Sequence, residues 1–134
     1  MLSQRLVSPI VLGRGDYHRQ YEPLWYGWNA DAARLNPLED RKQSDLWQIP
    51  RPKRSELHPT QKPVELVSRA LTNSSNRGAL ALEVFGGSGS TLIAAEQTGR
   101  RCAAVELMPV YCQVIIERWQ SLTGKRAEKI GSAP

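Results

Sequence analysis

Cysteine and histidine are scarce in this chain of 134 residues, which contains two of each. Cys102 and Cys112 have no companion ligands at the spacing of a zinc site, and His18 and His58 lie too far apart to form one. We therefore expect no metal. The two isolated cysteines are interpreted as small core residues of a protein in a reducing compartment.

Long apolar runs are also missing. No apolar stretch reaches the roughly 18 residues that a membrane-spanning helix requires, and the sequence shows no signal peptide. A cytoplasmic protein without a membrane partner is therefore expected. The net charge of +5 and the pI of about 9.6 favour a nucleic-acid partner, although many soluble proteins are equally basic.

A glycine-rich turn at residues 85–89 is the most informative feature that is present. An apolar run at 79–84 precedes it, and a helix-like stretch at 92–97 follows it. A second apolar run, 101–105, ends at Glu106, whose carboxylate can accept hydrogen bonds from ribose hydroxyls. This order predicts strand, turn, helix and strand. Because glycines let the backbone approach a bulky ligand, the turn predicts an adenosine-containing cofactor.

The residues that follow the turn distinguish three cofactor classes. A nucleoside triphosphate P-loop needs a lysine after its last glycine, but Ser90 and Thr91 follow Gly89 here. A dinucleotide fold uses a third glycine for close packing of helix on strand, and Leu92 occupies that position. S-adenosylmethionine (SAM) has no pyrophosphate to seat on the helix, so it suits the turn best. A plain glycine-rich turn without a ligand is the alternative.

A second polar segment, residues 58–63, lies upstream and leads into a helix. Pro63 suits the first helical position, and apolar residues recur at helical spacing over 64–71. An ordinary capped helix would explain this segment. However, a hydroxyl and a lysine at a helix start, here Thr60 and Lys62, can also receive a carboxylate such as that of methionine.

The segments 58–63 and 85–89 resemble, in this order, two motifs of the bacterial and phage DNA amino-methyltransferases: His-Pro-Thr-x-Lys-Pro and Phe-x-Gly-x-Gly. The order is that of the permuted β class of this family. The resemblance continues upstream through 12–18 and 21–28 and covers roughly residues 11–124. It implies a Rossmann-like α/β methyltransferase fold, SAM as the cofactor, and double-stranded DNA as the partner that is methylated on an exocyclic amine.

The resemblance also implies roles for individual residues. The residues expected to bind SAM are His58, Thr60, Lys62, Glu83, Phe85, Gly86, Gly87, Ser88, Gly89 and Glu106. The family places the segment 11–28 beside the target-base pocket, where Trp25, Tyr26 and Trp28 are candidates for stacking on an extruded base. Tyr26 and Trp28 are assigned to DNA binding, although an aromatic strand in a core explains them nearly as well.

One motif of the family is absent from the sequence. The catalytic tetrapeptide, Asp/Asn/Ser-Pro-Pro-Tyr/Trp, accepts the amino protons of the flipped base, and no Pro-Pro pair occurs in this chain. No catalytic residue is therefore assigned. We expect a C-terminal part of the enzyme: a truncated gene, a decayed copy or one half of a split enzyme. Glu83 and Val84 also replace the usual Asp-Pro of the family, which predicts a longer carboxylate arm and a looser turn.

The segment between the aromatic residues and the helix is basic and rich in proline. Five basic residues between positions 41 and 54 accompany one acid, Asp45, without clear periodicity. A loop region is therefore predicted at 29–57. Arg51, Lys53 and Arg54 are candidates for contacts to DNA phosphates, and a solvated charged loop is an equally open interpretation.

The expected organisation is one domain part at 1–124, followed by a polar tail at 125–134. Within it lie the target-pocket segment 11–28, the basic loop region 29–57 and the SAM-binding region 58–124. About three strands are recognisable, one of them in 11–28, and a final helix runs from Pro109 to Gly124. The predicted fold is an incomplete, mostly parallel sheet with flanking helices, and we expect a shortage of cover for the two sheet faces.

The predicted function is a part of a SAM-dependent DNA methyltransferase of the adenine-N6 type, inactive alone because the catalytic motif is missing. A complementing N-terminal methyltransferase half is the expected protein partner. A cytosine-N4 methyltransferase part is an alternative, because the residue that distinguishes the two bases belongs to the missing tetrapeptide. Two further interpretations are a non-catalytic SAM- or DNA-binding remnant that acts with a partner and, more weakly, a nicotinamide-dependent oxidoreductase fragment.

Overall fold

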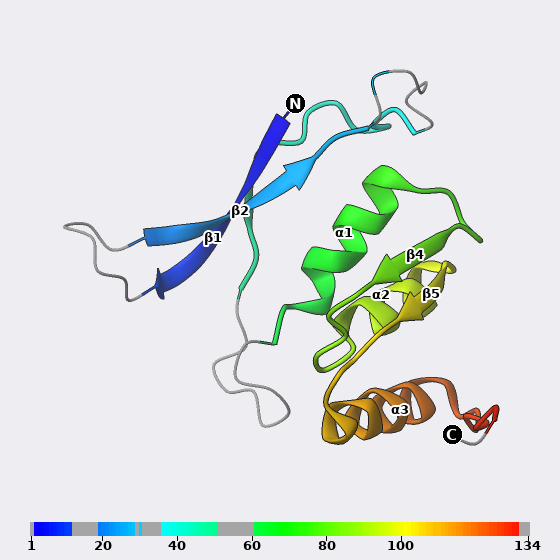
Figure 1. Ribbon diagram of the computed structural model, residues 1–134. Helices are drawn as coiled ribbons and strands as arrows, with labels where there is room; N and C mark the ends of the chain where they lie inside the picture. Colours follow the sequence, from blue (N-terminus) through cyan, green and yellow to red (C-terminus); the bar gives the residue numbers. More distant parts are fainter. Residues whose placement is uncertain (1, 12–18, 29, 31–35, 51–60, 132–134) are drawn as a thin grey trace.

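The computed structural model describes residues 2–11, 19–28, 30, 36–50 and 61–131 (Figure 1). The elements of this part of the chain are, in order, β1 (Leu2–Val11), β2 (Arg19–Tyr26), β3 (Leu46–Gln48), α1 (Val64–Ser74), β4 (Leu80–Glu83), α2 (Ser90–Thr98), β5 (Arg101–Ala104) and α3 (Pro109–Thr123). They form a three-stranded sheet with the order β2-β1-β3 and a two-stranded sheet, β4-β5.

The first sheet differs from the sequence prediction. β1 and β2 form an antiparallel hairpin, and β3 pairs parallel with β1. The sequence predicted one strand within 11–28, and β2 confirms it. The sequence analysis did not predict β1. The prediction of a loop region at 29–57 was also wrong where β3 lies. A three-residue strand is too short to carry a period of two, so nothing in its local sequence distinguishes it from a loop.

A buried cluster joins the first sheet to α1. Trp47 of β3 is 1% exposed and packs with Ile49 and with Leu66 of α1, while Leu24 and Ala70 pack against them partly buried. The Trp47 Nε1–H donates to the carbonyl oxygen of Ser44 (3.2 Å), which satisfies the polar group of this buried ring. The cluster therefore fixes β2 and β3 beside the helix that leads to the second sheet.

The second sheet confirms the predicted βαβ unit. β4 and β5 are parallel, in a register that pairs Leu80 with Arg101 and Glu83 with Ala104. The connecting helix, α2, is bounded by two glycines in the left-handed region, Gly89 with φ 81° and Gly99 with φ 70°. Such conformations suit glycine, which has no Cβ.

The two faces of this sheet are covered unequally, as Figure 1 shows. α2 packs on one face and buries Ile93, Ala94 and Ala95. On β4 and just beyond the strand ends, four apolar side chains remain 52–71% exposed: Leu80, Leu82, Val84 and Val105. The expected shortage of cover is therefore confirmed for the part of the chain that the structure describes, since parallel sheets are normally buried on both faces.

The helix ends follow the sequence signals closely, with one correction. α3 begins at Pro109 and is ended by Gly124 (φ 69°), as predicted. Pro63, however, precedes the first helical residue of α1, because its ψ of 134° is extended. Within the described residues, no helix combines the length and the apolar character needed to cross a membrane.

Candidate cofactor site

The glycine-rich turn lies at the carboxyl ends of β4 and β5, directly before α2. The Gly86 N–H donates to the Val105 carbonyl oxygen (2.9 Å), and the Gly89 N–H donates to the Gly86 carbonyl oxygen (2.8 Å). Gly87 and Gly89 have φ values of 52° and 81°. Ligands of α/β proteins bind at this edge of the sheet, so the turn occupies the expected place.

Helix α3 gives a further reason for glycine in this turn. A Cβ built on Gly86 would lie 3.1 Å from Ile115 Cδ1, and a Cβ on Gly89 would lie 3.0 Å from Ile115 Cγ1. Ile115 is buried, so it has little room to move. The prediction that these glycines admit a ligand is therefore incomplete, because the protein's own helix α3 also leaves little room for a side chain at Gly86 and Gly89.

Two carboxylates at the strand ends hold the turn. Glu83, the last residue of β4, accepts hydrogen bonds from the Phe85 N–H (2.9 Å) and the Thr91 hydroxyl (2.8 Å). Glu106, which follows β5, accepts one from the Gly87 N–H (2.6 Å). The two oxygens of Glu83 therefore join Phe85, the first residue of the turn, to Thr91 in the first turn of α2.

Lys62 is brought to the turn from the upstream motif. Its Nζ forms an ion pair with Glu22 of β2. Its carbonyl oxygen accepts a hydrogen bond from the hydroxyl of Ser90, the first residue of α2 (2.7 Å). Ser90 is buried, so this bond fixes the Lys62 backbone beside the turn. Two more motif residues predicted to bind SAM, His58 and Thr60, lie outside the described residues.

A cavity of about 740 Å³ opens between β2, the start of α1 and the turn. Six predicted SAM-binding residues line it: Lys62, Glu83, Phe85, Gly86, Gly87 and Ser88. Its volume falls within the range of about 300–1,000 Å³ that is typical of small-molecule sites. Gly89 and Glu106 belong to the turn and its support but do not line the cavity. A lysine and carboxylates around one cavity fit a ligand that carries both an ammonium and a carboxylate.

The aromatic residue of β2 that lines this cavity is Trp25, whose side chain is 76% exposed. Tyr26 and Trp28, which were predicted to bind DNA, contact each other edge to face with ring centroids 5.8 Å apart. Neither of the two lines the cavity. Of the three aromatic residues predicted to lie near the target base, Trp25 is therefore the one that the structure places at the cavity.

Arg118 is a supporting residue that the sequence reasoning missed. Its Nη1 donates to the carbonyl oxygen of Ser88 and, at 3.3 Å, to the Ser88 hydroxyl, so it ties α3 to the turn. Burial lowers the pKa of the Arg118 guanidinium from its ordinary value. The helical spacing from Ile115 to Arg118 places both on the side of α3 that meets the turn, which is the signal that could have identified it.

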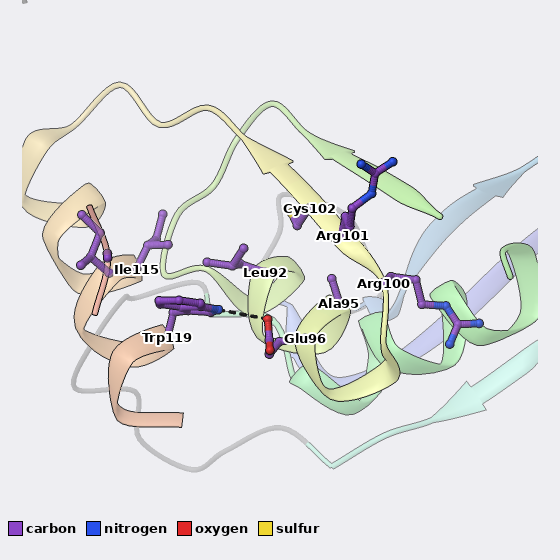
Figure 2. A pocket seen from close by; sticks show the side chains of 10 residues that line it. Leu92, Ala95, Glu96, Arg100, Arg101, Cys102, Ile115 and Trp119 are labelled. Carbon is purple, nitrogen blue, oxygen red and sulfur yellow. Dashed lines mark hydrogen bonds between the residues drawn. The ribbon is translucent and has the colours of Figure 1, made fainter. Parts of the chain in front are cut away.

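A second cavity, of about 400 Å³, lies between α2, β5 and α3 (Figure 2). Its wall is mainly apolar, with Leu92, Ile115 and Trp119, and the Trp119 Nε1–H donates to Glu96 Oε2 (3.1 Å). Cys102 also lines it, and burial, with a smaller contribution from the charge of Glu83, raises the pKa of this thiol. None of the predicted SAM-binding residues lines this cavity, so it is not the candidate site.

The remaining predictions concern DNA and metal. Arg51, Lys53 and Arg54 lie outside the described residues. Among the residues that the structure does describe, no group of three histidine, cysteine, aspartate or glutamate side chains is placed to hold a metal ion.

A parallel βαβ unit with a glycine-rich turn, a carboxylate after the second strand and an adjoining cavity defines the class of Rossmann-like, adenosine-cofactor proteins. A comparison with protein families shows to which family within this class the chain is related. The family described as DNA methylase (N6_N4_Mtase) matches residues 16–117. The chain belongs to this family, the DNA amino-methyltransferases, as its motifs predicted.

Curated relatives agree with this family. The type II methyltransferase M2.DpnII of Streptococcus pneumoniae is 32% identical over 126 residues, which are 85% of this chain and 47% of that protein. The type II methyltransferase M2.MboI of Moraxella bovis is 33% identical over 110 residues, 78% of this chain and 40% of that protein. The chain therefore spans less than half the length of these relatives.

Solved structures share the fold. TTHA0409 of Thermus thermophilus, complexed with S-adenosyl-L-methionine, is 26% identical with a TM-score of 0.61 over 90% of this chain and 53% of that one. M1.HpyAVI is 19% identical with a TM-score of 0.72 over 87% of this chain and 58% of that one. The predicted fold class, a partial SAM-dependent methyltransferase fold, is therefore confirmed.

Proposed function

We propose that this chain forms the SAM-binding part of a DNA adenine-N6 methyltransferase. The observation that carries the proposal is the cavity beside the glycine-rich turn, where six of the residues predicted to bind SAM meet. Membership of the DNA methylase family supports DNA as the substrate. YhdJ of Escherichia coli, 32% identical over 64% of this chain, is named a DNA adenine methyltransferase, which favours adenine over cytosine N4.

The charges around the cavity suggest how the cofactor lies. Lys62 binds the methionine carboxylate and Glu83 the methionine ammonium, each through charge-assisted hydrogen bonds. Glu106 accepts hydrogen bonds from the ribose hydroxyls, in exchange for its present bonds to the Gly87 and Met108 N–H groups. The bound cofactor supplies an electrophilic methyl group, and the residues of this chain bind and orient it. His58 and Thr60 are proposed members of the same site.

The proposed substrate of the complete enzyme is double-stranded DNA with its target base extruded. An exocyclic amine inside a duplex is out of reach of the cavity, so the base must leave the stack. Trp25 offers a stacking surface at the cavity, while Tyr26 and Trp28 are proposed to contact DNA beside it. Arg51, Lys53 and Arg54 are proposed to contact phosphates, which adds affinity without sequence specificity.

Methyl transfer is proposed to need a complementing methyltransferase part. The sequence has no Pro-Pro pair, so it lacks the residues that accept the amino protons of the base. The exposed apolar face of β4 and β5 offers a surface on which such a part can pack. The same missing pair favours the second candidate, a remnant that binds SAM or DNA without catalysis.

The test is tritium transfer from labelled SAM to unmethylated DNA, followed by identification of the methylated nucleoside. We expect no transfer by the chain alone, and N6-methyladenine when an N-terminal half of a related enzyme is co-expressed with it. Transfer by the chain alone would contradict the assignment of the catalytic residues to another part. Failure with every half that forms a soluble complex would favour the non-catalytic remnant, and N4-methylcytosine would change the target base.

A further inference from the structure

An acidic residue of β2 points toward the cofactor site. Glu22 and Leu24 are half-buried, whereas Tyr21, Pro23 and Trp25 are exposed, so alternate residues of this strand face opposite ways. Leu24 packs against the buried cluster on α1. Glu22, two residues earlier in the strand, therefore lies on the same inner face, toward the start of α1.

Glu22 uses this position to contact Lys62. The two side chains form an ion pair between residues that are 40 positions apart, and both line the cavity beside the glycine-rich turn. The backbone of Lys62 is fixed to α2 through the buried Ser90 hydroxyl. The lysine is therefore anchored to the cofactor side of the cavity, while its carboxylate partner belongs to the strand that carries Trp25.

The pair is exposed enough to exchange partners. The Lys62 side chain is 45% exposed and that of Glu22 is 31% exposed. Ion pairs in contact with water contribute little to folding stability, because water competes for both charges. A carboxylate that enters the cavity can therefore replace Glu22 on the ammonium of Lys62.

We propose that Glu22 competes with the carboxylate of the cofactor for Lys62, so that the Glu22 carboxylate lowers the affinity for the cofactor. This inference rests on the proposed function, since it takes SAM as the ligand. Glu22 is then a positioning residue that acts through Lys62.

The test is calorimetric titration of the full chain and of Glu22→Gln with two ligands, SAM and decarboxylated SAM. Glutamine keeps the size of the side chain and removes its charge. We expect Glu22→Gln to bind SAM about two- to fivefold more tightly, the range of a partly exposed ion pair. Decarboxylated SAM keeps the sulfonium and the ammonium, so its affinity should not rise.

Two controls separate competition from a general charge effect. Glu65→Gln removes an exposed charge in the first turn of α1, three residues from Lys62, and should leave both affinities unchanged. Lys62→Met should weaken SAM binding and abolish the effect of Glu22→Gln in the double variant. Weaker or equal SAM binding by Glu22→Gln, or an equal gain for both ligands, would overturn the inference. No SAM binding by the wild-type chain would instead overturn the proposed function.

Discussion

The two sides of the glycine-rich turn differ in what they contact. On one side the turn packs against α3, where Ile115 is buried and Arg118 bonds to Ser88. On the other side it faces the cavity, where Phe85 is 85% exposed and the Lys62 ammonium is held by one partly exposed carboxylate. The first side is closed by the protein itself, and the second presents charged and apolar groups to a ligand.

This difference separates residues that support the turn from residues that are available for binding. Substitutions on the α3 side should lower the free energy of unfolding, because close-packed neighbours cannot adjust. Substitutions on the cavity side should change binding with little effect on stability, because exposed side chains lose few contacts. Glu106 belongs to both groups, since it holds the Gly87 N–H and is proposed to bind ribose.

The largest effect on stability is expected for Gly89→Ala. The new side chain is placed in the left-handed region and its Cβ lies 3.0 Å from Ile115 Cγ1. Left-handed backbone costs about 1–2 kcal/mol and overpacking about 1–3 kcal/mol, so we expect a loss of roughly 2–5 kcal/mol in urea unfolding.

Gly124→Ala is the matched control for this substitution. Gly124 has a similar φ of 69°, but nothing lies within 4 Å of its added Cβ. Gly124→Ala should therefore lower the free energy of unfolding only by the cost of the left-handed backbone, about 1–2 kcal/mol. Equal losses for the two variants would mean that α3 does not constrain the turn.

A smaller effect, on binding alone, is expected for Trp25→Ala. The ring is 76% exposed, so its removal should change the free energy of unfolding by less than about 0.5 kcal/mol. Stacking of a base on an aromatic ring contributes about 1–3 kcal/mol, and DNA affinity should fall by that amount in fluorescence anisotropy. Trp28→Ala, outside the cavity, should weaken binding less. The reverse order would place the base at Trp28.

The smallest effect concerns the pH dependence of stability through Cys102. Burial first, and the charge of Glu83 second, raise the pKa of the Cys102 thiol. The folded protein therefore holds the thiol proton more tightly, and this contribution is present below the ordinary thiol pKa of about 8.5 and is lost as the pH rises through the folded value. We expect the wild type to lose more stability than Cys102→Ala between pH 8 and pH 10, in urea unfolding under reducing conditions. Parallel losses would contradict the shift.

The region around the turn was largely predictable because its signals are local. Glycine at both ends of α2 and at the end of α3 permits a left-handed backbone there, and the proline at the start of α3 fixes φ at a helical value. The apolar runs before and after α2 predicted the ends of β4 and β5 to within one residue. Contacts such as Arg118 with Ser88 were missed, because they join residues 30 positions apart on different elements.

The first sheet was less predictable because its stability comes from distant partners. β3 pairs Leu46 with Arg5, and Trp47 is buried against Leu66 of α1. Neither the strand pairing nor the packing of Trp47 produces a periodic sequence pattern in the basic segment around β3. The pair of Glu22 and Lys62 depends in turn on how this sheet packs against α1, so no motif identifies it.

The central claim is that the cavity beside the turn binds SAM, with Glu106 holding the ribose. The most direct measurement is calorimetric titration of the wild type and of Glu106→Ala with SAM and with NAD, with urea unfolding to verify that the variant is folded. We predict that SAM binds more tightly than NAD. We also predict that Glu106→Ala loses about 2–4 kcal/mol of SAM affinity, the contribution of two hydrogen bonds to a carboxylate. Tighter binding of NAD, or an unchanged SAM affinity in a folded Glu106→Ala variant, would contradict the account.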